Sequence, residues 1–287
     1  MRKVGIFYAY WVKDWETDFF PYVEKAKKLG FDILELHAAV AHTMSRDHRL
    51  RIRDEAERCG IELSFGMGLP AEYDLSSLDE NVRTAGLRYM ETVIREVAEM
   101  GGSMIGGTVH SYWPATLPKD VESKEPLLEQ SVRSMRELMP VASEHGVTLN
   151  VEVLNRFEQF LINDCHEAVA YMKRVDHDNC RVLMDTFHMN IEEDSLGGAL
   201  RTIAPYMKSL HLGEPNRKPP GMGRFPWTEI KQALDDINYD GPLVMEPFVL
   251  PGGQISRDIG VWRDIVPDPD LDSMAAKACE FVKENLR

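Results

Sequence analysis

Four short apolar segments in the second half of the chain each carry a side chain that binds metal ions. The four residues are Glu152, Asp185, His211 and Glu246, at successive spacings of 33, 26 and 35 residues. Each spacing is close to one strand–helix–strand unit, so successive parallel strands could bring three carboxylates and one imidazole together. Ligation dominated by oxygen with one nitrogen suits Mn²⁺, Co²⁺ or Mg²⁺, whereas structural Zn²⁺ favours thiolates. The pattern predicts a divalent metal site.

Two of these four residues are glutamates, Glu152 and Glu246, on the first and last of the four strands. A carboxylate bound through one oxygen can take or give a proton with the other. A cation that holds a carbonyl and its neighbouring hydroxyl acidifies the carbon between them by stabilising the enediolate. One base on each face of a sugar would therefore invert a stereocentre. The alternative is that both glutamates only bind the metal, in a hydride-shift isomerase or a hydrolase.

Apolar runs typical of buried strands recur along the whole chain, with amphipathic helical segments between them. Their continuous hydrophobicity indicates a parallel sheet covered by helices. Eight such units in about 250 residues predict an α/β protein with one (β/α)8 TIM-barrel domain over residues 1–287. A doubly wound sheet is the alternative, but the G-x-G-x-x-G fingerprint is missing. The predicted strands are Val4–Tyr10, Phe31–Leu36, Ile61–Met67, Ser103–Val109, Val147–Leu154, Arg181–Asp185, Met207–Leu212 and Pro242–Glu246.

Two long loops, His110–Glu125 and Gly213–Trp227, follow the fourth and seventh predicted strands. Such loops lie at the carboxyl-terminal mouth of a barrel, where active sites form. Glu158, His188 and Arg217 add polar groups near the predicted ligands. His188 comes just past a strand end, where it could bond a substrate oxygen, and Arg217 could hold either a sugar oxygen or a phosphate.

Aromatic side chains also gather at the predicted mouth: Phe7, Trp15, Trp113 and Phe248. Phe7 and Phe248 follow the first and last strands, which are neighbours in a closed barrel. Aromatic rings commonly pack against the C–H faces of sugars, although core packing is the usual role of any single ring. The adjacency favours a sugar pocket.

The overall charge limits the partners of the chain. With 33 basic and 47 acidic residues the net charge is −14, which argues against nucleic acid and anionic membrane surfaces, and so against a nuclease. The four cysteines are scattered, no apolar run reaches membrane-spanning length, and the amino-terminal segment lacks a cleavage site. These features predict a cytoplasmic protein. A non-catalytic sugar-binding barrel would leave the paired glutamates unexplained.

The strings GIFYAYW, VEVLNRFE, DTFHMNIEED, HLGEPNRKPPGMGR, VMEPF and GVWRD run along essentially the whole chain. In these strings the chain resembles the D-tagatose 3-epimerase and D-psicose (D-allulose) 3-epimerase family. The resemblance implies a (β/α)8 barrel with Mn²⁺ or Co²⁺ that epimerises unphosphorylated ketoses at C3 through a cis-enediolate. Such ketoses include the pairs D-fructose/D-psicose and D-tagatose/D-sorbose, and the family pattern suggests a homodimer or homotetramer.

Matched by motif, the resemblance makes Glu152 and Glu246 both metal ligands and the acid/base pair. It makes Asp185 and His211 the remaining ligands. The alternative on the same sugar-barrel scaffold is an aldose–ketose isomerase or a polyol dehydratase.

The resemblance also assigns the substrate contacts. Glu158, His188 and Arg217 would hold the O1–O3 end of the sugar. At the C4–C6 end the signals are mixed, because Phe7, EYDLSS and NRFEQFLIND look like the tagatose type and HSYWP looks like the psicose type. Gly66, where the tagatose type tends to carry Cys, and Thr108 would meet that end. The preferred ketose is therefore left open.

Overall fold

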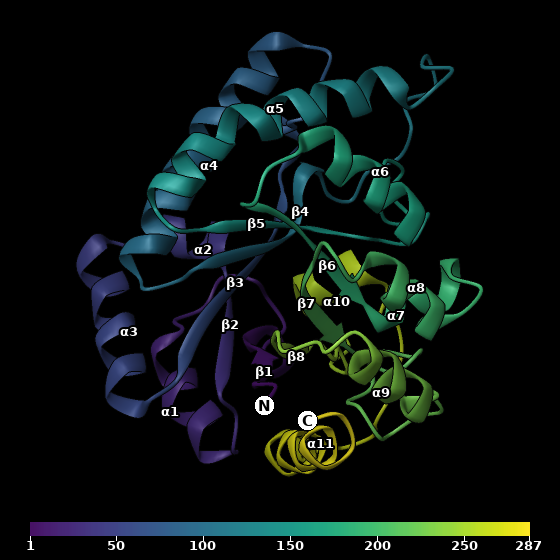
Figure 1. Ribbon diagram of the computed structural model, residues 1–287. Helices are drawn as coiled ribbons and strands as arrows, with labels where there is room; N and C mark the ends of the chain where they lie inside the picture. The colour runs from purple at the N-terminus through teal and green to yellow at the C-terminus, as the bar shows by residue number, and fades with distance from the viewer.

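Eight parallel strands form a closed barrel in the order in which they occur along the chain (Figure 1). The computed structural model describes residues 1–287. The last strand closes the barrel on the first, with Gly5 opposite Val244. The predicted TIM barrel is therefore confirmed. The strands are β1 Val4–Phe7, β2 Ile33–His37, β3 Glu62–Leu69, β4 Met104–Tyr112, β5 Thr148–Glu152, β6 Cys180–Asp185, β7 Met207–Leu212 and β8 Leu243–Met245.

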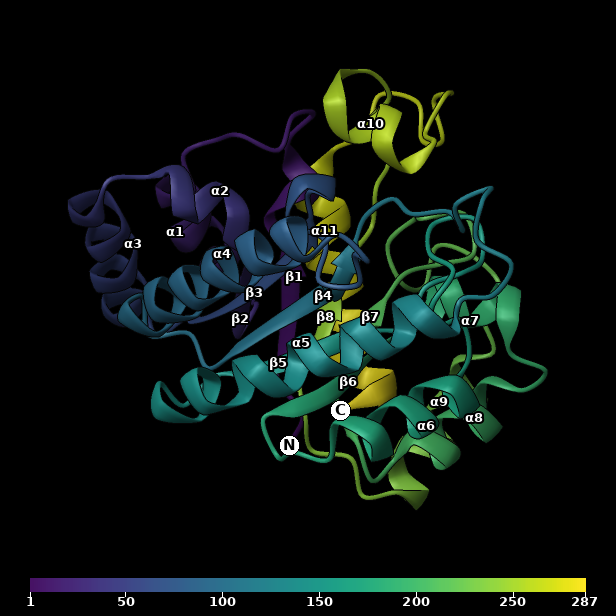
Figure 2. The same cartoon turned by 90° about the horizontal axis from the view of Figure 1, so that it is seen from above.

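Helices surround the barrel, and short 3₁₀ helices follow β1 and β3 (Figures 1 and 2). None of the helices has the length and apolar character needed to cross a membrane. The helices are α1 Phe20–Lys28, α2 Ala38–Thr43, α3 Arg46–Cys59, α4 Glu80–Glu99, α5 Glu125–Glu144, α6 Cys165–Val175, α7 Thr186–Glu192, α8 Leu196–Ile203, α9 Trp227–Asp236, α10 Gly253–Ile259 and α11 Leu271–Leu286, with 3₁₀ helices η1 Tyr8–Trp11 and η2 Ala71–Tyr73.

The prediction that the first strand continues to Tyr10 is wrong, because β1 ends at Phe7 and the chain turns into η1. The tyrosines of η1 are buried by contacts outside the sheet. The Tyr8 hydroxyl donates to the carbonyl oxygen of Trp15 at 2.6 Å, and the Tyr10 hydroxyl donates to that of Leu271 at 3.1 Å. The apolar sequence therefore extends beyond the end of β1 because Tyr8 and Tyr10 are buried against other segments of the chain.

Strand β4 is longer than predicted and enters the segment expected as a loop. Its pairing with β3 shifts, since Gly68 lies opposite Thr108 but Leu69 lies opposite Tyr112. A bulge of this kind adds unpaired residues to one strand and changes where the following side chains point. Here it precedes Trp113, whose backbone N–H donates to the carbonyl oxygen of Leu69 at 2.9 Å.

Helix α10 stands apart from the ring of helices in Figure 2. It is bound to the segment that follows η1. The backbone N–H of Ile255 donates to the carbonyl oxygen of Lys13 at 2.9 Å, and the Trp15 indole N–H donates to Asp258 at 2.7 Å. These contacts fix α10 beside the strand ends of the mouth.

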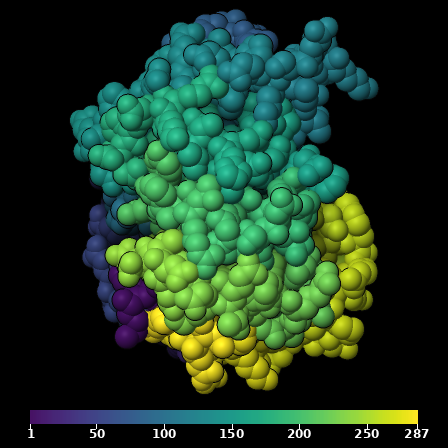
Figure 3. Space-filling view, turned by 45° about the vertical axis from the view of Figure 1, so that its right-hand side comes forward, coloured from purple at the N-terminus to yellow at the C-terminus, as the bar shows by residue number.

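The two ends of the chain lie side by side, as Figures 1 and 3 show. Arg2 is buried and joins them. Its Nη1 donates to the carbonyl oxygen of Leu286, its Nε to that of Tyr239 at 2.8 Å, and its Nη2 to Asp235 at 2.8 Å. One side chain next to β1 therefore holds the last helix and α9.

Candidate active site

The carboxyl ends of β5 to β8 bring together the four predicted metal ligands. Glu152 ends β5, Asp185 ends β6, His211 lies near the end of β7, and Glu246 directly follows β8. One ligand atom from each residue lies within 4.8 Å of the other three. Three of the side chains are buried and Glu246 is partly buried. The barrel thus gathers the four residues whose types and spacing predicted a cluster.

The orientation of His211 is set by a residue that the sequence analysis missed, Glu35 of β2. His211 Nε2 lies 2.9 Å from Glu35 Oε1, and the Ser64 hydroxyl donates to Glu35 Oε2 at 3.0 Å. His211 Nδ1 is buried without a hydrogen-bond partner. Burial opposes a positive charge on the ring, but the Glu35, Glu246 and Glu152 carboxylates outweigh it and raise the pKa of His211 well above its usual range, so the site attracts positive charge. With one proton on Nε2, His211 would offer Nδ1 to a cation. Nδ1 lies 3.8 Å from Glu152 Oε1 and 3.7 Å from Glu246 Oε1. A bare imidazole nitrogen among carboxylate oxygens fits a divalent cation.

The electrostatics of the cluster support the same interpretation. Burial, followed by the neighbouring Glu246 carboxylate, raises the pKa of Glu152 well above its usual range. Burial also raises the pKa of Glu246 to about 7. Burial acts against ionisation of Asp185 as well, but His188 and Arg217 hold its pKa below the usual value. Crowded buried carboxylates resist ionisation together, and a bound cation removes that cost.

Arg217 is buried beside the cluster and is shared by three carboxylates. Its Nη1 donates to Glu246 Oε2 at 3.1 Å and lies 3.4 Å from Asp185 Oδ2, while Nη2 lies 3.6 Å from Glu158 Oε1. The guanidinium stacks on the Phe187 ring at 3.7 Å. Because these carboxylates neutralise its charge, the phosphate-binding alternative for Arg217 is disfavoured.

His188 presents a hydrogen-bond donor to the same space. The Asn155 backbone N–H and side-chain amide donate to His188 Nδ1 at 3.2 and 2.8 Å, so the ring proton belongs on Nε2. Nε2 faces Glu152 Oε1 at 3.9 Å and Asp185 Oδ2 at 3.8 Å. Burial lowers the pKa of His188 to about 4, so the ring is neutral near neutral pH. A neutral donor beside the cluster can bind a sugar oxygen.

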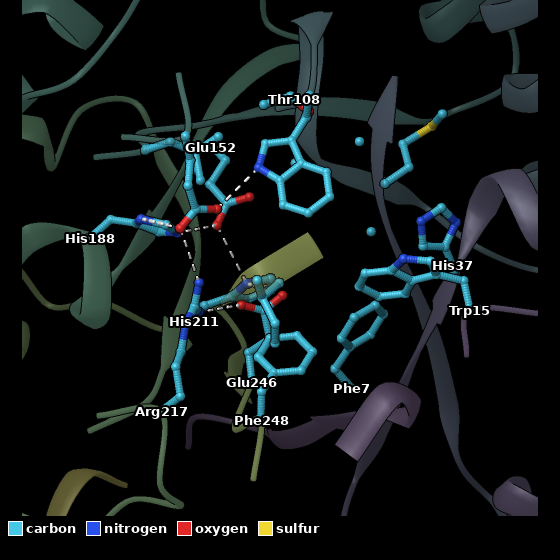
Figure 4. A pocket seen from close by; sticks show the side chains of 18 residues that line it. Phe7, Trp15, His37, Thr108, Glu152, His188, His211, Arg217, Glu246 and Phe248 are labelled. Atoms are coloured by element: carbon cyan, nitrogen blue, oxygen red, sulfur yellow. Dashed lines mark hydrogen bonds and ion pairs between the residues drawn. The ribbon is translucent and has the colours of Figure 1, made fainter. Parts of the chain in front are cut away.

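Every predicted site residue except Asp185, which lies beneath the surface, lines one cavity. Figure 4 shows the polar cluster on one side and the rings of Phe7 and Trp15 on the other. The Phe7 and Phe248 rings meet edge to face at 6.3 Å, and Trp15 meets Trp113 at 6.5 Å. The Trp113 indole N–H also donates to Glu158 at 3.1 Å. A charged end facing an aromatic wall suits a sugar.

Comparisons with known proteins agree with this architecture. Residues 23–265 match the xylose isomerase-like TIM barrel family. The chain is 46% identical over 282 residues to D-psicose 3-epimerase of Ruminiclostridium cellulolyticum, covering 97% of this chain and 96% of that protein. The chain is a member of the ketose 3-epimerase family. A second relative, D-psicose 3-epimerase of Agrobacterium fabrum, is 44% identical over 272 residues, covering 95% and 94% of the two chains.

The three-dimensional structure of a relative also matches this chain. The crystal structure of D-psicose 3-epimerase with D-tagatose from Clostridium cellulolyticum H10 superposes with a TM-score of 0.97, at 46% identity and 99% coverage of both chains. The relatives named here are epimerases, a class of isomerase. They do not favour the two alternatives on the same scaffold, an aldose–ketose isomerase and a polyol dehydratase.

Several cavity residues of this ketose 3-epimerase family member were not predicted. They are His37, Met67, Gly68, Gly107, Leu154 and Ile259. His37 was missed because the predicted strand stopped at Leu36, one residue short of its true end. Ile259 was missed because α10 reaches the cavity only through its tertiary contacts. Glu35 did carry a signal: like Glu152, it is a lone charge in an apolar strand.

Proposed function

We propose that this protein is a metal-dependent ketose 3-epimerase acting on unphosphorylated ketoses. One observation carries the proposal: two glutamates, the buried Glu152 at the end of β5 and the partly buried Glu246 directly after β8, flank His211 Nδ1 at 3.8 and 3.7 Å. Each can give one oxygen to a cation and keep the other for proton transfer. A hydrolase or a binding protein needs no such pair.

The reaction follows from this arrangement. One glutamate removes the C3 proton, and the electrons of the C–H bond form the double bond of a cis-enediolate between C2 and C3. The other glutamate returns a proton to the opposite face of C3, and the C2 carbonyl is restored. A divalent cation would stabilise the negative charge that develops on the C2 oxygen.

The remaining site residues bind and orient the sugar in this proposal. Glu158, His188 and Arg217 hold the O1–O3 end beside the metal ligands, where the structure groups their polar atoms. Phe7, Trp15, Trp113 and Phe248 pack against C–H groups, and Gly66 and Thr108 border the C4–C6 end. The named relatives favour D-fructose and D-psicose as the first substrates to test.

Glu152→Gln and Glu246→Gln should each lower the rate of C3 epimerisation by about 10³-fold, because each removes one acid/base group. NMR of D-fructose and D-psicose in heavy water measures both the product and the deuterium at C3. Glu62→Gln, an exposed acid at the other end of β3, is the matched control and should keep full activity. An aldose product, or full activity in either site variant, would overturn the mechanism.

We propose Mn²⁺ as the metal, with Co²⁺ or Mg²⁺ as substitutes, since three carboxylates and one imidazole suit these ions. Removing metal with a chelator should abolish epimerisation and lower the unfolding temperature, because an ion bound only by the folded chain stabilises it. Adding back each ion alone, and recording both quantities, ranks the metals. Full activity after complete stripping would exclude a metal-dependent reaction.

A homodimer or homotetramer and a cytoplasmic location complete the proposal. Two exposed apolar side chains on mouth segments, Phe157 and Ile191, support association. Their segments are joined by the ion pair of Arg156 with Glu192 at 2.6 Å. All four cysteines are free, which suits a reducing compartment. Sedimentation of the purified protein tests the assembly.

A further inference from the structure

His37, the last residue of β2, lines the cavity on the wall opposite the metal ligands (Figure 4). Its ring lies 5.4 Å from that of Trp15, centre to centre. Trp15 is held in turn by the hydrogen bond from its indole N–H to Asp258 of α10. The imidazole is therefore fixed between a strand end and a braced aromatic ring.

The two nitrogens of His37 have different surroundings. Nδ1 is shielded from solvent and has no hydrogen-bond partner. The residue is only partly buried, and Nε2 is not among the shielded, unpaired atoms, so Nε2 is the ring nitrogen that can reach the cavity lined by His37. Burial lowers the pKa of His37 to about 4, so the ring is neutral and carries one N–H. A shielded N–H without an acceptor is costly, which places the proton on Nε2.

The wall around His37 offers few other polar side chains. His37 lies opposite Gly66 of β3, and the lining of the cavity also includes Met67, Gly68 and Ile259. Together with the Thr108 hydroxyl, which also has no partner, His37 supplies one of the few directed polar groups of a mostly apolar wall. Such an arrangement gives orientation and specificity in ligand sites. The charged groups all lie at the other end, with the metal ligands.

We propose that His37 donates a hydrogen bond from Nε2 to a hydroxyl oxygen at the C5–C6 end of the ketose, and so helps to determine which ketoses are accepted. The assignment rests on the proposed function, because C2 and C3 must lie at Glu152 and Glu246 for the chemistry. The rest of an open-chain sugar then extends toward the opposite wall. A site built to bond a hydroxyl discriminates against a ketose that lacks it.

The test compares one ketohexose with its 5-deoxy and 6-deoxy counterparts. For the wild type, removing the bonded hydroxyl should lower kcat/KM by about 2- to 10-fold, the effect of one neutral hydrogen bond. His37→Phe should accept the full and the deoxy sugar equally well, with a raised KM and little change in kcat for the full sugar. His37→Gln keeps an N–H donor and should retain part of the discrimination.

His42→Phe is the matched control, since His42 lies on α2 and pairs with Glu96 at 2.7 Å outside the cavity. His42→Phe should keep the wild-type ratios of kcat/KM between the full and the deoxy sugars. Ratios that are unchanged in His37→Phe, or an equal loss on all three sugars, would overturn the assignment.

Binding of the same sugars is measured by calorimetry, so that the assignment is tested apart from turnover. If the wild type exchanges no C3 proton, the proposed function fails while the binding ratios still test His37. If it epimerises but binds all three sugars alike, only the assignment of His37 fails.

Discussion

Glu35 decides which nitrogen of His211 is available to a metal ion. Its carboxylate lies 2.9 Å from Nε2 and is itself held by the Ser64 hydroxyl. Both partners are buried, so water does not compete for these bonds. A carboxylate in this position fixes the tautomer and raises the basicity of the liganding nitrogen. The candidate metal site therefore depends on a residue of β2, three strands away from β7 around the closed barrel.

Glu35→Met should weaken metal binding by about 10- to 100-fold, because methionine fills similar space but cannot replace the carboxylate that accepts the hydrogen bond from His211 Nε2. Titration of the stripped protein against a competing chelator measures the affinity. Glu35→Gln offers an amide oxygen to Nε2 and should recover part of the loss. Equal affinities in the wild type and both variants would show that His211 needs no such partner.

The metal cluster could be predicted because a lone charge at the end of a buried strand needs a partner, and four such charges recurred at strand–helix spacing. Glu35 carries the same signal on β2, but its partner, His211, lies 176 positions away in a strand that only barrel closure brings near. A prediction of His37 as a cavity residue would have needed the exact end of β2. Sequence patterns locate elements better than they locate the last residue of each.

At the level of elements, the approach of β3 and β4 shapes the floor of the cavity. Gly107 adopts φ +106, and a Cβ there would lie 2.0 Å from the Met67 carbonyl oxygen. The adjacent bulge then turns the chain toward Trp113. Hydrophobic runs predicted that these strands exist and are neighbours. They carry no information on a register shift, which depends on backbone contacts between the strands.

Gly107→Ala should lower the free energy of unfolding by about 3 kcal/mol, since it combines an unfavourable φ with a backbone clash. It should also reduce activity, because the cavity wall must move. Gly146→Ala is the control: its φ is +66 but nothing lies within 4 Å of the added Cβ, so a loss of about 1 kcal/mol is expected. Urea unfolding measures both values, and equal losses would refute the clash.

At the level of the whole molecule, buried neutral histidines make the stability depend on pH. His110 is fully buried between the sheet and α6, with its ring 5.9 Å from that of Tyr171, and neither nitrogen has a hydrogen-bond partner. Burial lowers the pKa of His110 to about 3. The unfolded chain takes up this proton near pH 6.5, so it binds more protons than the folded chain below that pH. Stability therefore falls as the pH is lowered.

His110→Phe should reduce the loss of stability between pH 7 and pH 5 by about 2 kcal/mol, because it removes one imidazole that protonates only on unfolding. Urea unfolding of the metal-free wild type and variant at both pH values gives the comparison. Removing the metal keeps ligand protonation out of the measurement. His177→Asn, at an exposed position, should keep the wild-type difference, and an unchanged difference in His110→Phe would contradict the explanation.

The hydrogen bonds of Arg2 with Leu286, Asp235 and Tyr239 have a consequence for how the chain folds during its synthesis. During synthesis the first strand leaves the ribosome long before the residues that it must meet. Contacts so distant in sequence form late, since the whole intervening chain must be ordered first. Glu246 directly follows β8, the last strand to emerge, so its carboxylate reaches the candidate site only when the barrel closes. A nascent chain therefore keeps an open seam and an incomplete site until β8 and α11 have emerged.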